Sequence, residues 1–376
     1  MRIAFIARST LYKVHGGITV QVLETAKHLR ELGVEVTIHL TDEEIPYDEF
    51  DLLHFFDITR PANILYHIAR TQKPFVLSPV LIDYSEYDKN HRPGLSGFVF
   101  RRFRAGNNEY IKAVSRWLLL KDKLQSKNYL WKGHDQSIRR ILRAVNMLLP
   151  NSGQEYEELN RLYPYHKPYM IVPNGIDEKI FIPDRAAKKN EQLVVCAARI
   201  EGIKNQFNLI RALNDTAYRL LLIGDASPNQ AAYYELCRRT AGNNISFIGR
   251  LPQEELIHYY NDAKVHVLPS WFETCGLSSL EAAAMGCNIV VADKGFTHEY
   301  FGEQAFYCDP GDPVSIYRAV EQAATSRQQE VLQAKVLANY TWRHAAVQTL
   351  KAYQKILATG VPAENRTLKL EGNDQL

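Results

Sequence analysis

Two carboxylates with seven residues between them, Glu273 and Glu281, lie in the stretch SWFETCGLSSLEAAAMG (270–286). The apolar run before this stretch predicts a strand, and the alanine-rich run predicts a helix that begins near Ser278. The first amides of a helix have no partner within it and carry about half a positive charge, which suits a phosphate. Gly276 would let the backbone approach that ligand closely. The stretch therefore predicts a phosphate site, with Glu273 at the carboxyl end of the strand.

The same stretch has a second interpretation. Ser278 and Glu281 have the S-x-x-E spacing of a capping box, in which the two side chains close the start of a helix. In that case Glu281 has only a structural role. A capping role leaves Glu273 unexplained, and spacing alone does not decide between the two interpretations.

Two cations, Arg199 and Lys204, lie in AARIEGIKNQ (197–206), between a predicted strand and a predicted helix. Anions bind to loops at this position in α/β sheets. A guanidinium can clamp two phosphate oxygens, and an ammonium acts as a point charge. The alternative is a pair of solvated loop cations.

Gly16 and Gly17 occupy the first predicted strand-to-helix turn. They lack the third glycine of the dinucleotide fingerprint G-x-G-x-x-G, so that motif is not present. The pair is either an ordinary tight turn or a place where the backbone approaches a phosphate or a sugar.

Short apolar runs alternate with helical stripes along the chain, which is typical of parallel sheets covered by helices. The pattern predicts an α/β protein with two doubly wound, Rossmann-like domains, 1–175 and 176–340, facing each other across a cleft. A last helix at 341–358 should pack back on the first domain, and 359–376 should form a flexible tail. The predicted strands are 2–7, 34–40, 51–56, 75–79, 146–150 and 169–173, and then 193–198, 218–224, 245–249, 265–269, 288–292 and 305–309.

Five motifs occur in the order found in glycosyltransferase family 4, which has the GT-B fold, and the chain resembles this family over nearly its whole length. The motifs are GGITVQVLETAKHLRELGVEVTI (16–38), VPNGID (172–177), RIEGIK (199–204), ETCGLSSLE (273–281) with the E-x7-E spacing, and DPGDP (309–313). The resemblance implies transfer of a sugar from a nucleotide-sugar with retention of configuration at the anomeric carbon.

The resemblance also assigns roles to the predicted residues. Arg199 and Lys204 would hold the donor diphosphate, and Glu273 would contact the hydroxyls of the donor sugar. Glu281 would accept hydrogen bonds from the ribose hydroxyls, which replaces the capping interpretation. The remaining expected contacts are Gly17 beside the diphosphate with Gly16 next to it, the amides of Gly276, Leu277 and Ser278 facing the donor, and the backbone of Arg250 near the base.

Charge chemistry agrees with these roles. Breaking the sugar–phosphate bond places negative charge on the leaving diphosphate, and fixed donors at such a charge are typically worth about 100-fold or more in rate each. The sequence has no D-x-D motif, so no metal and no other cofactor is expected beside the UDP- or GDP-sugar donor. By analogy with the family, the leaving phosphate takes the proton of the acceptor.

One departure from the family concerns a histidine that often follows the fourth strand of the first domain. Here that place reads FVLSPVLIDYSEYD (75–88), where Asp83, Tyr84 or Glu86 could take its position. Asp83 is the predicted acceptor-side group, and the alternative is an ordinary loop carboxylate. Phe296 replaces a family glycine and is expected to reshape the sugar pocket.

Residues 92–143 hold thirteen Lys/Arg against three Asp/Glu, although the whole chain is only at +3. This basic segment is either a surface for anionic lipid, which would suit a lipid-linked acceptor, or the solvated face of a core helix. A helical apolar stripe runs from the end of this segment to just beyond it, through Ile138, Ile141, Leu142, Val145 and Leu149. Nucleic acid is not expected, because no nucleic-acid-binding motif accompanies the charge.

The five cysteines form no C-x-x-C pair, and each lies in an apolar or helical context, so free buried thiols in a reducing compartment are expected. The chain starts with a predicted strand and has no apolar run of membrane-spanning length. A cytoplasmic enzyme is expected, and it would be peripheral at the inner face of the membrane if the basic segment binds anionic lipid.

The resemblance implies a retaining glycosyltransferase with a glycan or lipid-linked acceptor, and the family suggests a role in surface polysaccharide or lipopolysaccharide synthesis. Two alternatives stay open. A GT-B sugar-nucleotide epimerase would bind a donor but need no acceptor, and a non-catalytic protein would bind a nucleotide-sugar and serve a partner.

Overall fold

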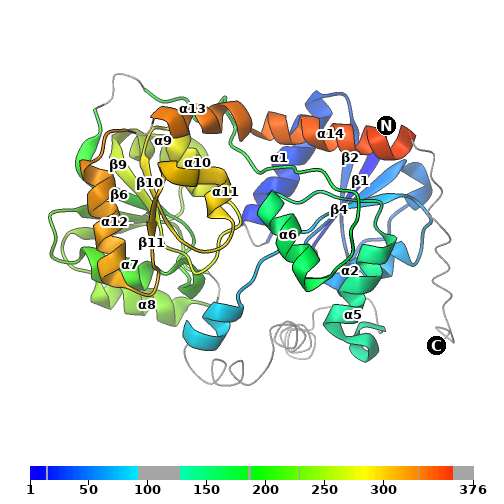
Figure 1. Cartoon of the computed structure of the whole chain (residues 1–376), viewed down its shortest axis with the longest axis horizontal. Helices are drawn as coiled ribbons and strands as arrows, with labels where there is room; N and C mark the ends of the chain where they lie inside the picture. Colours follow the sequence, from blue (N-terminus) through cyan, green and yellow to red (C-terminus); the bar gives the residue numbers. More distant parts are fainter. Residues whose placement is uncertain (14–15, 92–127, 185–187, 228, 329, 359–376) are drawn as a thin grey trace. The chain divides into compact units, whose positions relative to one another are not determined.

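A computed structural model describes residues 1–13, 16–91, 128–184, 188–227, 229–328 and 330–358 (Figure 1). The chain divides into two compact units. The first contains 1–81, 128–173 and 342–358, and the second contains 82–91 and 174–341 among the described residues. Each unit is an α/β layer structure with one fully parallel sheet.

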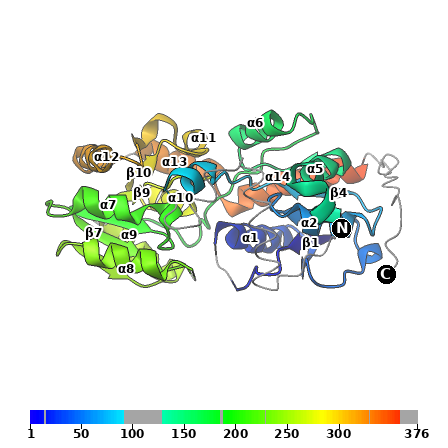
Figure 2. The ribbon, with the colours of Figure 1, turned by 90° about the horizontal axis from the view of Figure 1, so that it is seen from below.

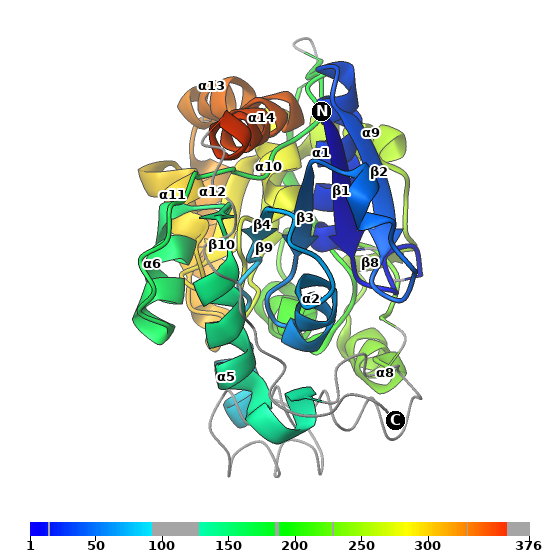
Figure 3. The same ribbon diagram turned by 90° about the vertical axis from the view of Figure 1, so that its right-hand side faces the viewer.

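The first unit has a sheet in the order β2-β1-β3-β4-β5 (Figure 3). Its strands are β1 (Arg2–Ala7), β2 (Glu35–Leu40), β3 (Leu52–Phe56), β4 (Phe75–Ser78) and β5 (Met147–Leu148). Its helices are α1 (Gly17–Glu31), the 3-10 turn η1 (Tyr47–Glu49), α2 (Pro61–Ile68), α5 (Asn128–Ala144), α6 (Gly153–Leu162) and α14 (Trp342–Ala358). Helix α14 packs on α1, and α2 packs on α5.

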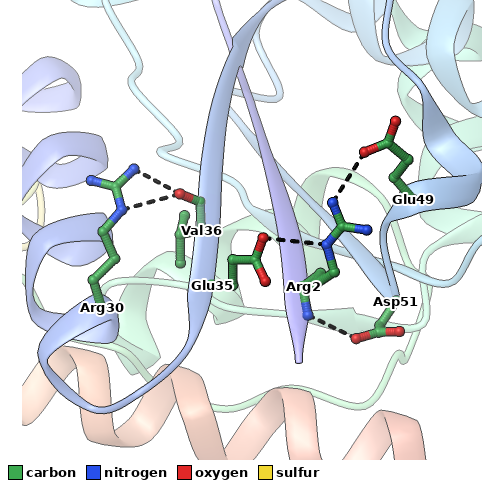
Figure 4. Close-up of polar contacts among 6 residues, drawn as sticks. All are labelled: Arg2, Arg30, Glu35, Val36, Glu49 and Asp51. Atoms are coloured by element: carbon green, nitrogen blue, oxygen red, sulfur yellow. Dashed lines mark hydrogen bonds and ion pairs between the residues drawn. The ribbon is translucent and has the colours of Figure 1, made fainter.

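Charged residues fix the amino-terminal edge of this sheet (Figure 4). The Arg2 guanidinium lies 3.3 Å from Glu35 and 3.0 Å from Glu49, and the Arg2 amide donates to Asp51 at 2.7 Å. Arg30 at the end of α1 donates two hydrogen bonds to the Val36 carbonyl, at 3.0 and 2.7 Å. These contacts tie β1, β2, α1 and the start of β3 together at the edge opposite the strands' carboxyl ends.

The second unit has a sheet in the order β11-β10-β9-β6-β7-β8. Its strands are β6 (Asn190–Ala197), β7 (Arg219–Ile223), β8 (Ile245–Ile248), β9 (Ala263–Leu268), β10 (Asn288–Ala292) and β11 (Phe306–Cys308). The helices α7 (Gln206–Leu213), α8 (Ala231–Thr240) and α12 (Pro313–Thr325) share one face of the sheet (Figures 1 and 2). The other elements are α9 (Gln253–Asp262), α10 (Leu277–Ala284), α11 (Thr297–Phe301), α13 (Glu330–Asn339), the π-helical turn η2 (Tyr87–His91) and the 3-10 turns η3 (Gly202–Lys204) and η4 (Gly302–Gln304).

Eleven of the twelve predicted strands are confirmed within a few residues, because parallel strands are buried on both faces and therefore appear as continuous apolar runs. The predicted strand at 169–173 is wrong. This segment makes hydrogen bonds beside β5 but only a single isolated bridge, between Leu148 and Tyr169. Pro150, Pro168 and Pro173 cannot donate to a ladder, which limits pairing here.

Residues 82–91 differ from the predicted domain organisation. The sequence places them in the first domain because they follow β4, whereas the structure groups them with the second unit. The reason is apolar packing, since Tyr84 and Tyr87 lie against Ile203 and Trp271 of the second unit.

The described part of the basic segment is a core helix. Ile138, Ile141 and Leu142 of α5 and Val145 just after it are buried in the first unit, and Arg143 donates to the Tyr165 hydroxyl at 2.9 Å. Most of the segment, 92–127, lies outside the described residues, as does the predicted tail at 359–376. All five cysteines are buried and free, as predicted. No described helix combines the length and apolar character needed to cross a membrane.

Candidate active site

The candidate site lies where the strand order of the second sheet reverses. The chain moves from β6 outward to β7 and β8, and then returns to the opposite side of β6 as β9. Ligands of doubly wound sheets bind at the carboxyl ends of the strands at such a switch point. Lys204 follows β6 and Glu273 follows β9, so these two predicted residues lie on both sides of the reversal.

The structure brings Lys204 and Glu273 into direct contact. The Lys204 ammonium donates to Glu273 Oε1 at 2.5 Å, and the two side chains are only 22% and 11% exposed. Burial lowers the pKa of Lys204, but Glu273, Tyr84 and Glu201 more than offset this, so the pKa is raised. Lys204 is therefore a permanent cation at the switch point, and it is not a solvated loop residue.

Three hydrogen bonds to backbone carbonyls hold the loop of Lys204 in place. Asn205, in the left-handed conformation with φ 61°, donates side-chain hydrogen bonds to the carbonyls of Pro269 at 3.1 Å and Pro310 at 2.7 Å. The Trp271 amide donates to the Ile203 carbonyl at 2.9 Å. Since two of these bonds join the Lys204 loop to the loop after β9 and the third joins it to the residues after β11, the ion pair is held by hydrogen bonds as well as by charge.

Gly295 and Phe296 clamp the backbone of Glu273 from the other side. The Phe296 amide donates to the Glu273 carbonyl at 2.9 Å, and a Cβ on Gly295 would lie 2.0 Å from that same oxygen. Gly295 also has φ 73°, so a side chain is excluded there for two reasons. The Phe296 ring packs edge-on against Phe272 with 5.4 Å between ring centroids.

Arg199 lies in the same loop but is more open. Its guanidinium pairs with Glu201 at 2.8 Å, and its side chain is 39% exposed. Ser227 donates to the other oxygen of Glu201 at 2.8 Å. Arg199 is therefore a partly exposed cation that can exchange Glu201 for another anion at modest cost.

Helix α10 starts at Leu277, with Gly276 as its N-cap in the left-handed conformation, φ 67°. The predicted capping box is wrong, because no side chain caps this helix and the amides of Ser279 and Leu280 both bond the Gly276 carbonyl. The amides of Gly276, Leu277 and Ser278 precede the first intrahelical bond. They follow Glu273 by three to five residues, and their contact with a phosphate stays a prediction.

Glu281 is buried one turn into α10. Gln253 donates to one of its oxygens at 2.9 Å, and the Tyr260 hydroxyl donates to the other at 3.5 Å. Burial raises the pKa of Glu281 to about 7, against hydrogen bonds from Gln253 and Tyr260 that lower it. Because no side chain caps α10, helix capping does not explain why this carboxyl is buried. Groups with a shifted pKa are common at functional sites.

The other predicted residues lie apart from this cluster. Arg250 is exposed between β8 and α9, and its amide donates to Asp225 at 3.1 Å. Asp83 is exposed and accepts a hydrogen bond from the Ser85 amide at 2.8 Å. Gly16 and Gly17 begin α1 in the first unit, where Gly16 is an extended N-cap. Their substrate contacts stay predictions.

A hollow of about 320 Å³ lies beyond Gly295, at the carboxyl ends of β10 and β11. Its size is at the lower end of the range of about 300–1,000 Å³ for small-molecule pockets. Carboxylates, an ammonium and a phenol ring line it, and all of these can contact a sugar. The lining residues are Asp293, Lys294, Tyr307, Cys308, Asp309 and Pro310.

Sequence reasoning missed Asn205, Tyr87 and the clamp at Gly295. Asn205 could have been suspected from its place just before a helix, where a left-handed Asn is tolerated. No local signal identifies Tyr87, because its partners Ile203 and Trp271 are distant in the sequence.

Two parallel Rossmann-like sheets, one in each unit, place this chain in the GT-B class of α/β folds. Sucrose-phosphate synthase from Thermosynechococcus elongatus has a similar structure, with a TM-score of 0.74 at 18% identity over 95% of this chain and 99% of that one. A structure of Anabaena HepE in complex with UDP-glucose gives 0.62 at 15% identity over 96% and 99%.

Sequence comparisons agree with the fold. Residues 177–338 match the family model described as glycosyl transferases group 1. D-inositol 3-phosphate glycosyltransferase of Kribbella flavida is 26% identical over 74% of this chain and 75% of the relative. O-antigen chain mannosyltransferase B of Escherichia coli is 28% identical over 58% and 63%. The chain is a glycosyltransferase with the GT-B fold.

Proposed function

We propose that this glycosyltransferase is a retaining enzyme of family 4 that moves a sugar from a nucleoside-diphosphate sugar to a glycan or lipid-linked acceptor. The observation that carries the proposal is the Lys204–Glu273 pair at 2.5 Å, held at the switch point beside the first amides of α10. Lys204, Arg199 and these amides would bind the diphosphate, and Glu273 would bind hydroxyls of the sugar. The O-antigen mannosyltransferase among the relatives supports a role in surface polysaccharide synthesis.

The donor can be identified by thermal shift against a panel of nucleoside diphosphates and their sugars. Ligand that binds only the folded state raises the melting temperature by mass action, so the strongest stabiliser reports the base and the sugar. HepE binds UDP-glucose, so the panel starts with uridine compounds and continues with guanosine compounds. Product formed only when an acceptor is present supports transfer; conversion of the donor without acceptor would identify an epimerase instead.

We expect activity to persist without divalent metal. The leaving diphosphate develops negative charge, which Mg²⁺ neutralises in metal-dependent transferases. Here the positive charge would come from Lys204, Arg199 and the start of α10. Treatment with EDTA followed by gel filtration should leave the transfer rate within about twofold of the untreated enzyme. A loss that added Mg²⁺ or Mn²⁺ restores would refute this.

Glu281 is expected to make binding of the nucleotide-sugar depend on pH. Its raised pKa of about 7 means that the carboxylate needed to accept ribose hydroxyls forms only as the pH rises through neutrality. If only the ionised form binds, affinity for the intact nucleotide-sugar should be about tenfold lower at pH 6 than at pH 8, since each pH unit below the pKa costs a factor of ten. The intact donor is the right probe, because its diphosphate does not titrate in this range.

Glu281→Gln is the matched variant for that measurement, and calorimetric titration at both pH values gives the affinities. The amide should bind the donor weakly and equally at both pH values. The raised pKa also makes ionised Glu281 destabilising as pH rises from its ordinary value towards 7, so the variant should melt no lower than the parent at pH 8. A variant that keeps donor affinity and melts much lower would give Glu281 a structural role.

A further inference from the structure

Residues 82–91 form part of the wall around the Lys204 loop. Tyr87 is buried with Ile203 and Trp271, and Tyr84 packs against this cluster. A Cβ on Gly202 would lie 1.8 Å from the Tyr87 hydroxyl oxygen and 2.8 Å from Cζ, so only glycine at 202 leaves room for the ring. The glycine of the RIEGIK motif thus admits a tyrosine from a distant part of the chain.

A charged contact of the neighbouring residue supports the same placement. Lys294 donates to both oxygens of Glu86, at 3.0 Å each. Exposed pairs of this kind contribute little stability, so the buried ring of Tyr87 is the main anchor. Tyr84 lies just before these two anchors in the chain and packs on the same cluster, next to the Lys204 loop.

The Tyr84 phenol lies among the four charged groups of that site. Burial is the main cause that raises the pKa of Tyr84, with Lys204 and Arg199 opposing it and Glu201 and Glu273 adding to it, and the net result is a pKa of about 12. At neutral pH Tyr84 is therefore an un-ionised hydroxyl that can donate a hydrogen bond. The nearby Asp83 carboxylate accepts from the Ser85 amide and Glu86 is paired with Lys294, so neither side chain offers a hydrogen-bond donor to an anionic ligand.

We propose that Tyr84 is a donor-binding residue, whose hydroxyl donates a hydrogen bond to an oxygen of the donor diphosphate held by Lys204. The assignment rests on the proposed function, because it needs a diphosphate at Lys204. It gives the segment after β4 a role in donor binding, where the sequence predicts an acceptor-side role for Asp83. The Tyr84 hydroxyl would orient the diphosphate through a hydrogen bond without adding a third positive charge to those of Lys204 and Arg199.

Tyr84→Phe tests the assignment because it keeps the ring that packs on Ile203 and Trp271. Calorimetric titration with UDP and GDP, and the donor KM and kcat, should show a loss of about 10- to 100-fold in affinity and in kcat/KM, as expected for a hydrogen bond to a charged group. The matched control is Tyr317→Phe, on α12 of the same unit, where the hydroxyl bonds Glu321 at 2.9 Å. This control should change neither quantity.

The nucleoside without phosphates, measured by competition, separates binding from structure. Tyr84→Phe should weaken the diphosphate and leave the nucleoside unchanged, with an unchanged melting temperature. Equal affinity of the parent and Tyr84→Phe for the diphosphate, or an equal loss for diphosphate and nucleoside, overturns the assignment of Tyr84 alone. If the parent binds no nucleoside diphosphate, or if Lys204→Ala binds it as well as the parent does, the proposed function fails and this assignment falls with it.

Discussion

Lys204→Ala is expected to lower kcat/KM by about 10²- to 10³-fold, the effect of removing one fixed donor from a developing negative charge. The Lys204 side chain is less exposed than that of Arg199, the other predicted diphosphate-binding cation, and it lies where the strand order reverses. Affinity for the nucleoside diphosphate should fall with it. Steady-state kinetics and calorimetric titration at one fixed ionic strength measure both, because exposed charges are screened by salt.

Loss of stability must be separated from this loss of activity. Without Lys204, the Glu273 carboxylate, which is only 11% exposed, loses its ion-pair partner. Breaking a fully buried ion pair costs about 3–5 kcal/mol of stability. The cost should be smaller here, because the Lys204 side chain is 22% exposed. The double variant Lys204→Met/Glu273→Leu removes both charges and should recover melting temperature but not activity.

Arg239→Ala is the control for net charge, since Arg239 is an exposed cation in the last turn of α8. It should keep the parent's activity and donor affinity. A Lys204→Ala enzyme that keeps donor affinity and kcat/KM within twofold of the parent contradicts the diphosphate role.

The sheets of both units could be predicted because their physics is local. A buried parallel strand needs apolar side chains on both faces, so it can be predicted from its own residues, whichever strands lie beside it. The failure at 169–173 has the same origin. The run YMIVP is apolar, but whether it joins a ladder depends on the donors of its neighbour, and Pro150 supplies none.

The candidate site was predictable only as two separate loops. Spacing pointed to Lys204 and to Glu273, which are 69 residues apart, but their contact depends on β6 and β9 being neighbours. Strand order is a property of the whole sheet and is not written in either loop. The same limit applies to Tyr84, because nothing in the sequence around it indicates that it will pack against Ile203 and Trp271.

The start of α10 illustrates a conflict between two local signals. Ser278 and Glu281 have capping-box spacing, but Gly276 adopts φ 67° and starts the helix one residue earlier than predicted. A helix that starts at Leu277 no longer has Ser278 at its cap position. Glu281 is then free to point to Gln253 and Tyr260, and a glycine conformation decides the role of a carboxylate.

Glu273→Ala should abolish transfer to below about one thousandth of the parent's kcat, because it removes two functions at once. The carboxylate is the proposed partner of the donor sugar hydroxyls, and it also holds the Lys204 ammonium at 2.5 Å. Glu273→Gln keeps an acceptor for both contacts but loses the charge, so it should retain about one tenth to one hundredth of kcat, the loss of a charge-assisted hydrogen bond.

Product formation under saturating donor measures kcat, and donor hydrolysis without acceptor measures bond breaking alone. Both should fall together in Glu273→Ala. If hydrolysis persists while transfer is lost, Glu273 serves the acceptor and not the donor; if the parent shows neither reaction with any donor that it binds, the chain binds nucleotide-sugar without catalysis.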